Sequence, residues 1–350
     1  MRASRFYLLL CITLAAGAAL LALSVTEERT VELAEGTVAA FPLLAEDPDA
    51  AARIVITNAA GQFALQRSAA ASLWLLPDKG GYPAETASVG KLLNGLAAMT
   101  LFEAKTARSE DLPLLDLAGP ASGPRIQVLD AAGMPLVDAV IGKQRENLGR
   151  VGVVGTYLRY SDADQAWLAL GAPVLPRSAL ATVNQTLLRL PGSVIARVEV
   201  TPPDGGAALL AQRPNRAQQS YALDPPPVSG VGVDQAALRR LADGLQLLVF
   251  DDVRPAEDLP FDQPWRAVFT SFDGIEITLS FIQDEGALWT RVSAEAVPPP
   301  GDEAKGPRDD AAAFAAELAL RSDGWVFRLN PQLFASLAKR RASVLTAPSE

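Results

Sequence analysis

After residue 50 the hydrophobic and polar positions fall into short runs that predict strands and helices. Residues 53–57 form a β-branched run typical of a strand, and apolar residues alternate with polar ones over 63–67. These two runs predict a hairpin. Apolar residues then recur at the spacing of one helix face, at Val89, Leu92, Leu93 and Leu96. Further strand-like runs lie at 125–129, 136–141 and 156–160.

The same pattern starts again in the second half of the chain. The six residues 52–57 (ARIVIT) are echoed by 196–201 (ARVEVT), and a turn, a strand and a helical pattern follow the echo. Strictly alternating strands and helices would indicate a doubly wound sheet, and that alternation is missing. We therefore expect an α+β fold of two similar units rich in antiparallel strands, each a hairpin, a helix and a small sheet. An internal duplication explains the pattern.

This pattern also predicts the borders of the parts. We expect a membrane anchor or signal peptide over residues 1–26 and a connector over 27–50. The two units are predicted over 51–192 and 193–341, and a flexible tail over 342–350.

The N-terminal segment 6–25 contains no charged residue. A helix of that length spans about 30 Å, the thickness of the hydrocarbon core of a bilayer. Arg2 and Arg5 precede it and Glu27 and Glu28 follow it, so the N-terminus is expected in the cytoplasm and the bulk of the chain in the periplasm. This arrangement predicts a single-pass protein of the bacterial inner membrane.

A cleaved signal peptide is the alternative for this segment, because residues 16–18 (AGA) are small enough for a cleavage site. The apolar run continues to Val25, which favours the anchor. Cys11 lies inside the run and lacks the small preceding residue that lipid attachment needs, so we interpret it as a small apolar residue.

Charge and composition narrow the chemistry. The chain has 31 Lys and Arg against 40 Asp and Glu, a net charge of -9, which argues against nucleic acid as a partner. It has no histidine, the commonest general base and a frequent metal ligand, and one cysteine. We therefore expect no catalytic, cofactor or metal site and no enzyme. A hydrolase built on carboxylate or serine chemistry is the less favoured alternative.

Three motifs have both a functional and a structural interpretation. Gly149, Gly152 and Gly155 resemble a nucleotide loop, but a strand follows and the lysine of a phosphate loop is missing, so a glycine-rich hairpin is favoured. The acidic pairs 251–252 and 309–310 could bind a cation, yet solvated turns are favoured. Four tryptophans could line a groove, although a place in the core is favoured: Trp74, Trp167, Trp289 and Trp325.

One basic cluster is the candidate interaction face. Lys143, Arg145, Arg150 and Arg159 lie around the glycine-rich hairpin. Together they could bind an anionic ligand or an acidic partner surface, although ordinary solvated charges are the alternative.

Several segments resemble the DUF4340 family, bacterial proteins of unknown function. The resemblance rests on the hairpin–Trp–helix segment 53–104, on IGK at 141–143, on GTYLR at 155–159 and on QAWL at 165–168. It is good over about residues 50–200 and fainter beyond. It implies a membrane-anchored envelope protein whose gene often neighbours those of a gliding-motility-type ABC transporter. It carries no catalytic residues.

Two functions are therefore expected. The first is a non-catalytic accessory or assembly protein outside the cytoplasm, an auxiliary component of an ABC-type transporter with its permease and ATPase as partners. The second is a periplasmic binding module for a cell-envelope ligand, held in a cleft between the two units.

Overall fold

The computed structural model describes residues 38–70, 72–148, 151–300 and 309–346. Their contacts divide the chain into two compact units, one built from residues up to 67 together with 87–177, the other from 68–86 together with 178 onwards. No helix in these described ranges is long and apolar enough to cross a membrane. The span predicted over 6–25 lies outside them.

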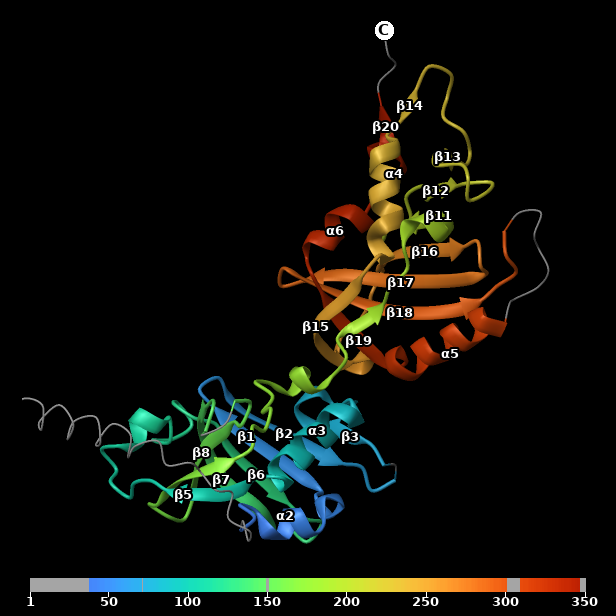
Figure 1. The fold of residues 1–350 in the computed structure, drawn as a ribbon. Helices are drawn as coiled ribbons and strands as arrows, with labels where there is room; N and C mark the ends of the chain where they lie inside the picture. Colours follow the sequence, from blue (N-terminus) through green and yellow to red (C-terminus); the bar gives the residue numbers. More distant parts are fainter. Residues whose placement is uncertain (1–37, 71, 149–150, 301–308, 347–350) are drawn as a thin grey trace, which may run out of the picture. The chain divides into compact units, whose positions relative to one another are not determined.

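The first sheet has nine strands in the order β4-β3-β2-β1-β6-β7-β8-β9-β5. The strand pairs that the structure describes are antiparallel. Most of these strands are labelled in Figure 1. Residues 68–86, which carry β3 and β4, are grouped with the second unit. The strands are β1 Arg53–Asn58, β2 Gly61–Arg67, β3 Trp74–Leu76, β4 Tyr82–Pro83, β5 Thr100–Ala104, β6 Arg125–Leu129, β7 Pro135–Arg145, β8 Gly155–Tyr160 and β9 Ala166–Leu170. The helices and 3₁₀ turns are α2 Pro42–Glu46, η1 Pro48–Ala50, η2 Pro77–Lys79, α3 Thr86–Ala97 and η3 Leu112–Leu115.

The second sheet also has nine strands, in the order β10-β15-β19-β18-β17-β16-β11-β12-β13. They are β10 Thr186–Leu188, β11 Ile195–Thr201, β12 Leu209–Gln212, β13 Ala222–Leu223, β15 Leu248–Pro255, β16 Trp265–Ser271, β17 Ile275–Asp284, β18 Ala287–Ala296 and β19 Trp325–Leu329. A small separate ladder pairs β14 Gly232–Val233 with β20 Leu345–Thr346. The helices and turns are η4 Ala179–Thr182, η5 Gly192–Val194, α4 Gln235–Ala242, η6 Asp243–Leu245, η7 Ala256–Asp258, α5 Asp309–Ser322, α6 Gln332–Leu337 and η8 Arg341–Val344.

The prediction of an α+β fold rich in antiparallel strands is confirmed. Eight strands follow the same order in both sheets: β3-β2-β1-β6-β7-β8-β9-β5 corresponds to β13-β12-β11-β16-β17-β18-β19-β15. The pairing register makes the correspondence specific to residues. Arg53 lies opposite Gln66 in β1–β2, and Arg197 lies opposite Gln212 in β11–β12.

Alternating burial explains why these segments form sheets with one packed face. In β6, Ile126 and Val128 are fully buried while the alternating Arg125 and Gln127 are half-buried, because successive side chains of a strand point to opposite faces. Helix α3 buries the four residues that the sequence places on its apolar face: Val89, Leu92, Leu93 and Leu96.

The segment leading into each unit closes the outer edge of its sheet. Residues 38–40 lie along β5, where the amide of Leu101 donates to the carbonyl of Val38 and Ala39 bridges Thr100. In the second unit β10 pairs with β15 in the same place. Residues 42–50, inside the range expected as a connector, form α2 and η1, and Phe41 and Leu44 are buried.

Candidate functional site

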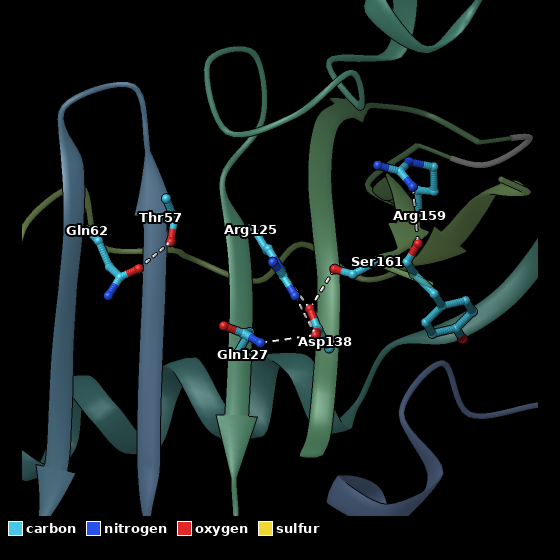
Figure 2. A network of polar contacts seen from close by, with 8 residues as sticks. Thr57, Gln62, Arg125, Gln127, Asp138, Arg159 and Ser161 are labelled. Atoms are coloured by element: carbon cyan, nitrogen blue, oxygen red, sulfur yellow. Dashed lines mark hydrogen bonds and ion pairs between the residues drawn. The ribbon is translucent and has the colours of Figure 1, made fainter. Parts of the chain in front are cut away.

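Strands β6 and β7 and the end of β8 in the first unit place four polar side chains together. Figure 2 shows Arg125, Gln127 and Ser161 converging on Asp138, with helix α3 passing behind the strands. Arg125 donates from Nε to Oδ1 of Asp138 at 2.8 Å and from Nη2 to Oδ2 at 2.7 Å. Gln127 donates to Oδ2 at 3.0 Å, and the hydroxyl of Ser161 donates to Oδ1 at 2.5 Å. Each carboxylate oxygen thus accepts two hydrogen bonds.

These bonds fix the charge of Asp138. Burial disfavours the ionised carboxylate, but the hydrogen bonds from Arg125, Ser161 and Gln127 outweigh burial and lower the pKa of Asp138 below its usual value. The same ion pair raises the pKa of Arg125, chiefly through its hydrogen bond to Asp138. Both groups are therefore charged at neutral pH.

A cavity of about 420 Å³ opens beside this network, and we call it the Asp138 cavity. Its wall includes the segment 40–43 and the start of β7, and Tyr160 donates from its hydroxyl to the carbonyl of Ala40 at 2.6 Å. Burial raises the pKa of Tyr160, so its phenol stays protonated. Apolar groups make up part of the rim: Phe41, Pro42, Leu43, Pro135 and Leu136.

The arrangement in the Asp138 cavity suits binding better than catalysis. Both carboxylate oxygens of Asp138 already accept hydrogen bonds, and the pKa of Asp138 is lowered, so this residue is a poor general base. Ser161 has a carboxylate but no imidazole or amine to take its proton. Within the described parts of the chain, no group of three or more His, Cys, Asp or Glu side chains could hold a metal ion.

The predicted basic face is divided in the structure. Lys143 and Arg145 are exposed on β7, whereas Arg150 lies outside the described residues. Arg159 is half-buried and donates to backbone carbonyls, from Nη1 to Ala163 at 2.9 Å and from Nε to Leu117 at 3.4 Å. Its guanidinium thus holds the loop between β5 and β6. That Lys143 and Arg145 bind an anionic surface stays a prediction.

The position of Arg159 has a counterpart in the second unit. The register pairs Arg159 with Val140 and Arg291 with Ser280 at corresponding places in the two sheets. Arg291 donates from Nη2 to the carbonyl of Ala256 at 3.0 Å, in the loop between β15 and β16. Both units therefore fasten the same loop by an arginine on the same strand.

The acidic pairs have separate roles. Asp251 and Asp252 belong to β15 rather than to a solvated turn, and a bulge between Phe250 and Asp252 shifts the strand register there. Asp251 accepts from Nε of Arg328 at 2.6 Å, and Asp252 lies 2.6 Å from Nζ of Lys79. The predicted turn is wrong here. Asp309 and Asp310 open helix α5, where acidic residues suit the helix N-terminus.

The structure supports the glycine interpretation where it describes the glycines, and it supports the tryptophan interpretation for two of the four side chains. Gly152 has a φ of +86° in the connection between antiparallel β7 and β8, so a strand follows the glycines as predicted. Trp74 and Trp289 are buried, at 5% and 2% exposure, which confirms their place in the core. Trp167 and Trp325 are half-buried.

Comparison with known proteins identifies the family but not an activity. The model of a domain of unknown function, DUF4340, matches residues 74–264, more than half of the 350-residue chain. The chain therefore belongs to this family, and the predicted resemblance is confirmed. No curated protein and no solved structure matches the chain.

The sequence did not reveal the Asp138 network. Gln127 and Asp138 face each other only because β6 and β7 pair in one register, with Gln127 opposite Asp138. The available signal was the alternation of Arg125 and Gln127 with the apolar Ile126 and Val128, and it indicates a solvated face as readily as a network.

Proposed function

We propose that this chain is a non-catalytic accessory protein of an ABC-type transporter, working outside the cytoplasm. Residues 6–25 anchor it in the bacterial inner membrane, the bulk of the chain lies in the periplasm, and the permease and ATPase are its partners. The proposal joins the uncharged N-terminal run to the family membership and to the Asp138 cavity.

The observation that carries the non-catalytic part is the mutual neutralisation of Arg125 and Asp138. The two side chains form an ion pair, so each neutralises the charge of the other. The cavity beside them has an apolar rim that includes Leu43, which is 56% exposed. Apolar side chains beside fixed polar groups are the composition of protein-binding surfaces. A partner segment that buries Leu43 gains apolar contact without breaking the ion pair.

The proposal includes an internal duplication of the folded part. The shared order of eight strands supports it, as do the matched arginines Arg159 and Arg291. A protein made of two copies with no common catalytic constellation is suited to holding partners rather than to transforming a substrate.

The test is purification of the full-length protein from membranes in mild detergent, followed by mass spectrometry of the co-purifying proteins. We expect the ATPase and permease subunits in stoichiometric amounts, and their loss with Leu43→Asp. Leu114→Asp is the matched control, because Leu114 is 67% exposed in the same unit and does not line the Asp138 cavity.

Each outcome separates a part of the proposal. Recovery of this chain alone, with the wild-type sequence, overturns the transporter role. Transporter subunits that remain with Leu43→Asp leave the role in place but remove the Asp138 cavity as the docking surface.

A binding module for a cell-envelope ligand is the second candidate, and the volume of the Asp138 cavity favours it. About 420 Å³ falls within the roughly 300–1,000 Å³ of small-molecule sites. Native mass spectrometry of the purified full chain would detect a retained ligand. We expect Phe41→Ala to release that ligand, and a wild-type spectrum without added mass would count against this candidate.

A further inference from the structure

One arginine of the second unit, Arg213, is buried far more deeply than Arg125 beside the Asp138 cavity. Arg213 follows β12 and its exposure is 6%. Its side chain donates to the backbone carbonyls of four residues: Ile195 from Nε at 3.1 Å and from Nη2 at 2.5 Å, Ser193 at 2.9 Å, Gln218 at 3.1 Å and Gly192 at 3.2 Å. The guanidinium also forms a hydrogen bond with the phenol of Tyr221.

No acidic side chain neutralises this guanidinium. Its central carbon lies 4.9 Å from the ring centre of Tyr221 and 5.4 Å from that of Phe272. In the described residues no Asp or Glu oxygen comes within the 4.0 Å of an ion pair. Carbonyl dipoles and aromatic faces lower the cost of burying the charge, but they leave its net value at +1.

The first unit shows the same device with a carboxylate added. The amide of Arg67 donates to the carbonyl of Ala52 at 2.8 Å, as the amide of Arg213 donates to the carbonyl of Ala196 at 2.8 Å. Arg67 also donates from Nη1 to the backbone carbonyl of Asp49, and its Nη2 lies 3.6 Å from Oδ1 of the same residue. The second unit keeps the contacts to carbonyls and lacks the carboxylate.

A cavity of about 210 Å³ lies against Arg213, and we call it the Arg213 cavity. Arg239, from the last turn of α4, also lines it, and its side chain makes no ion pair with any acidic residue that the structure describes. Asp243 is the one carboxylate in the lining. Two guanidinium groups against one carboxylate leave the walls with a net positive charge. Ser193 and Gln219 add polar groups.

We propose that the Arg213 cavity binds a small oxyanion, a phosphate or a carboxylate group. Arg239 contacts the anion directly, because its planar guanidinium matches two oxygens of a phosphate or carboxylate and makes no ion pair with the acidic residues in the described ranges. Arg213 supplies buried positive charge from the floor of the cavity. The anion takes the place that Asp49 has beside Arg67. This inference does not depend on the proposed transporter role.

The test is isothermal titration of the full chain in mild detergent with sodium phosphate and, separately, sodium acetate, both against chloride at equal ionic strength. We expect saturable binding of at least one anion with a Kd of about 1 mM or tighter. Binding of phosphate alone assigns a phosphate group, and binding of acetate assigns a carboxylate. Absence of binding by both anions overturns the proposal.

Variants of helix α4 supply the matched control. Arg239→Gln should weaken binding about tenfold, because it removes a charge-assisted hydrogen bond. Arg240→Gln removes the same charge one residue along, outside the cavity lining, and should leave the affinity unchanged. Equal weakening by both variants would indicate a general effect of helix charge and overturn the site.

A third variant tests the sign of the electrostatics. Asp243→Asn removes the competing negative charge from the lining without changing the size of the side chain. We expect binding a few-fold tighter in this variant. Weaker binding would show that Asp243 positions the anion's partners rather than repelling the anion, and would contradict the proposed charge balance.

Discussion

The two units share their strand order, but only some of their side-chain contacts occur in both. Arg159 and Arg291 occupy matching positions, and each donates to a carbonyl of the loop that follows β5 or β15. By the same register Asp138 corresponds to Thr278, and the carboxylate network has no counterpart there. A side chain bound to backbone keeps its partner whatever residue supplies the carbonyl, whereas a network of side chains needs every member. The comparison teaches that the common frame rests on contacts with the backbone.

The loop over β7 shows how the units diverge in packing. A Cβ on Gly142 would lie 2.1 Å from the carbonyl oxygen of Leu115, so the loop comes against the strand only because this residue has no side chain. The matching position of the second unit holds Ile282, which packs against the cluster of Leu259, Trp289 and Val326. One unit brings backbone close, and the other fills the space with side chains.

The largest expected effect on stability concerns Arg213 and Arg67, which occupy corresponding positions in the two units. Arg213→Met should lower the free energy of unfolding by about 3 kcal/mol or more, because it leaves several buried carbonyls without donors. Arg67→Met should cost less than about 1 kcal/mol, since its ion pair with Asp49 is exposed. Denaturant unfolding followed by circular dichroism measures both. Equal losses would show that the two arginines serve the same structural role.

A smaller loss is expected at Gly142. Gly142→Ala should cost about 2 kcal/mol, because the new methyl group meets backbone that cannot move aside without shifting the loop. Gly90→Ala is the control. A Cβ on Gly90, in helix α3, meets nothing within 4 Å, so alanine there should be neutral or stabilising. Thermal unfolding of the two variants measures both effects. A Gly142→Ala variant as stable as the wild type would contradict the close approach of the Leu115 carbonyl to Gly142.

The smallest effect depends on pH. Asp138→Asn should cost about 1–2 kcal/mol at pH 7, through weaker hydrogen bonds with Arg125 and its neighbours. The folded state lowers the pKa of Asp138, so its contribution is present above the unfolded pKa of about 3.9 and lost as the pH falls below that value. The difference between wild type and variant in urea unfolding should therefore shrink from pH 6 to pH 3. A difference that stays constant would contradict the role of the charge.

Local patterns predicted the frame of the fold. The run 53–57 corresponds to β1, the apolar spacing from Val89 to Leu96 corresponds to the buried face of α3, and the echo at 196–201 lies on β11. These predictions succeed because alternation and helical spacing are properties of neighbouring residues. Neither depends on which strands pair.

Contacts between distant segments could not be predicted in the same way. Arg213 is a single arginine beside a turn, and nothing near it in the sequence indicates five hydrogen bonds to carbonyls. The bulge that keeps Asp251 and Asp252 in a strand depends on pairing with β19, more than seventy positions later in the chain. Strand register and side-chain burial decide these contacts. Neither can be derived from the local pattern of a single sequence.

The closure of each outer sheet edge also bears on how the chain folds as it is made. Residues 38–40 leave the ribosome before β5, and β10 leaves it before β15, so each edge strand meets an earlier segment that covers its free side. Once β5 and β15 are paired in this way, the backbone groups on that side of each strand are not available to a neighbouring nascent chain. Neither closure waits for residues of the other unit. Each half of the molecule thus protects its own exposed strand in the order in which it is translated.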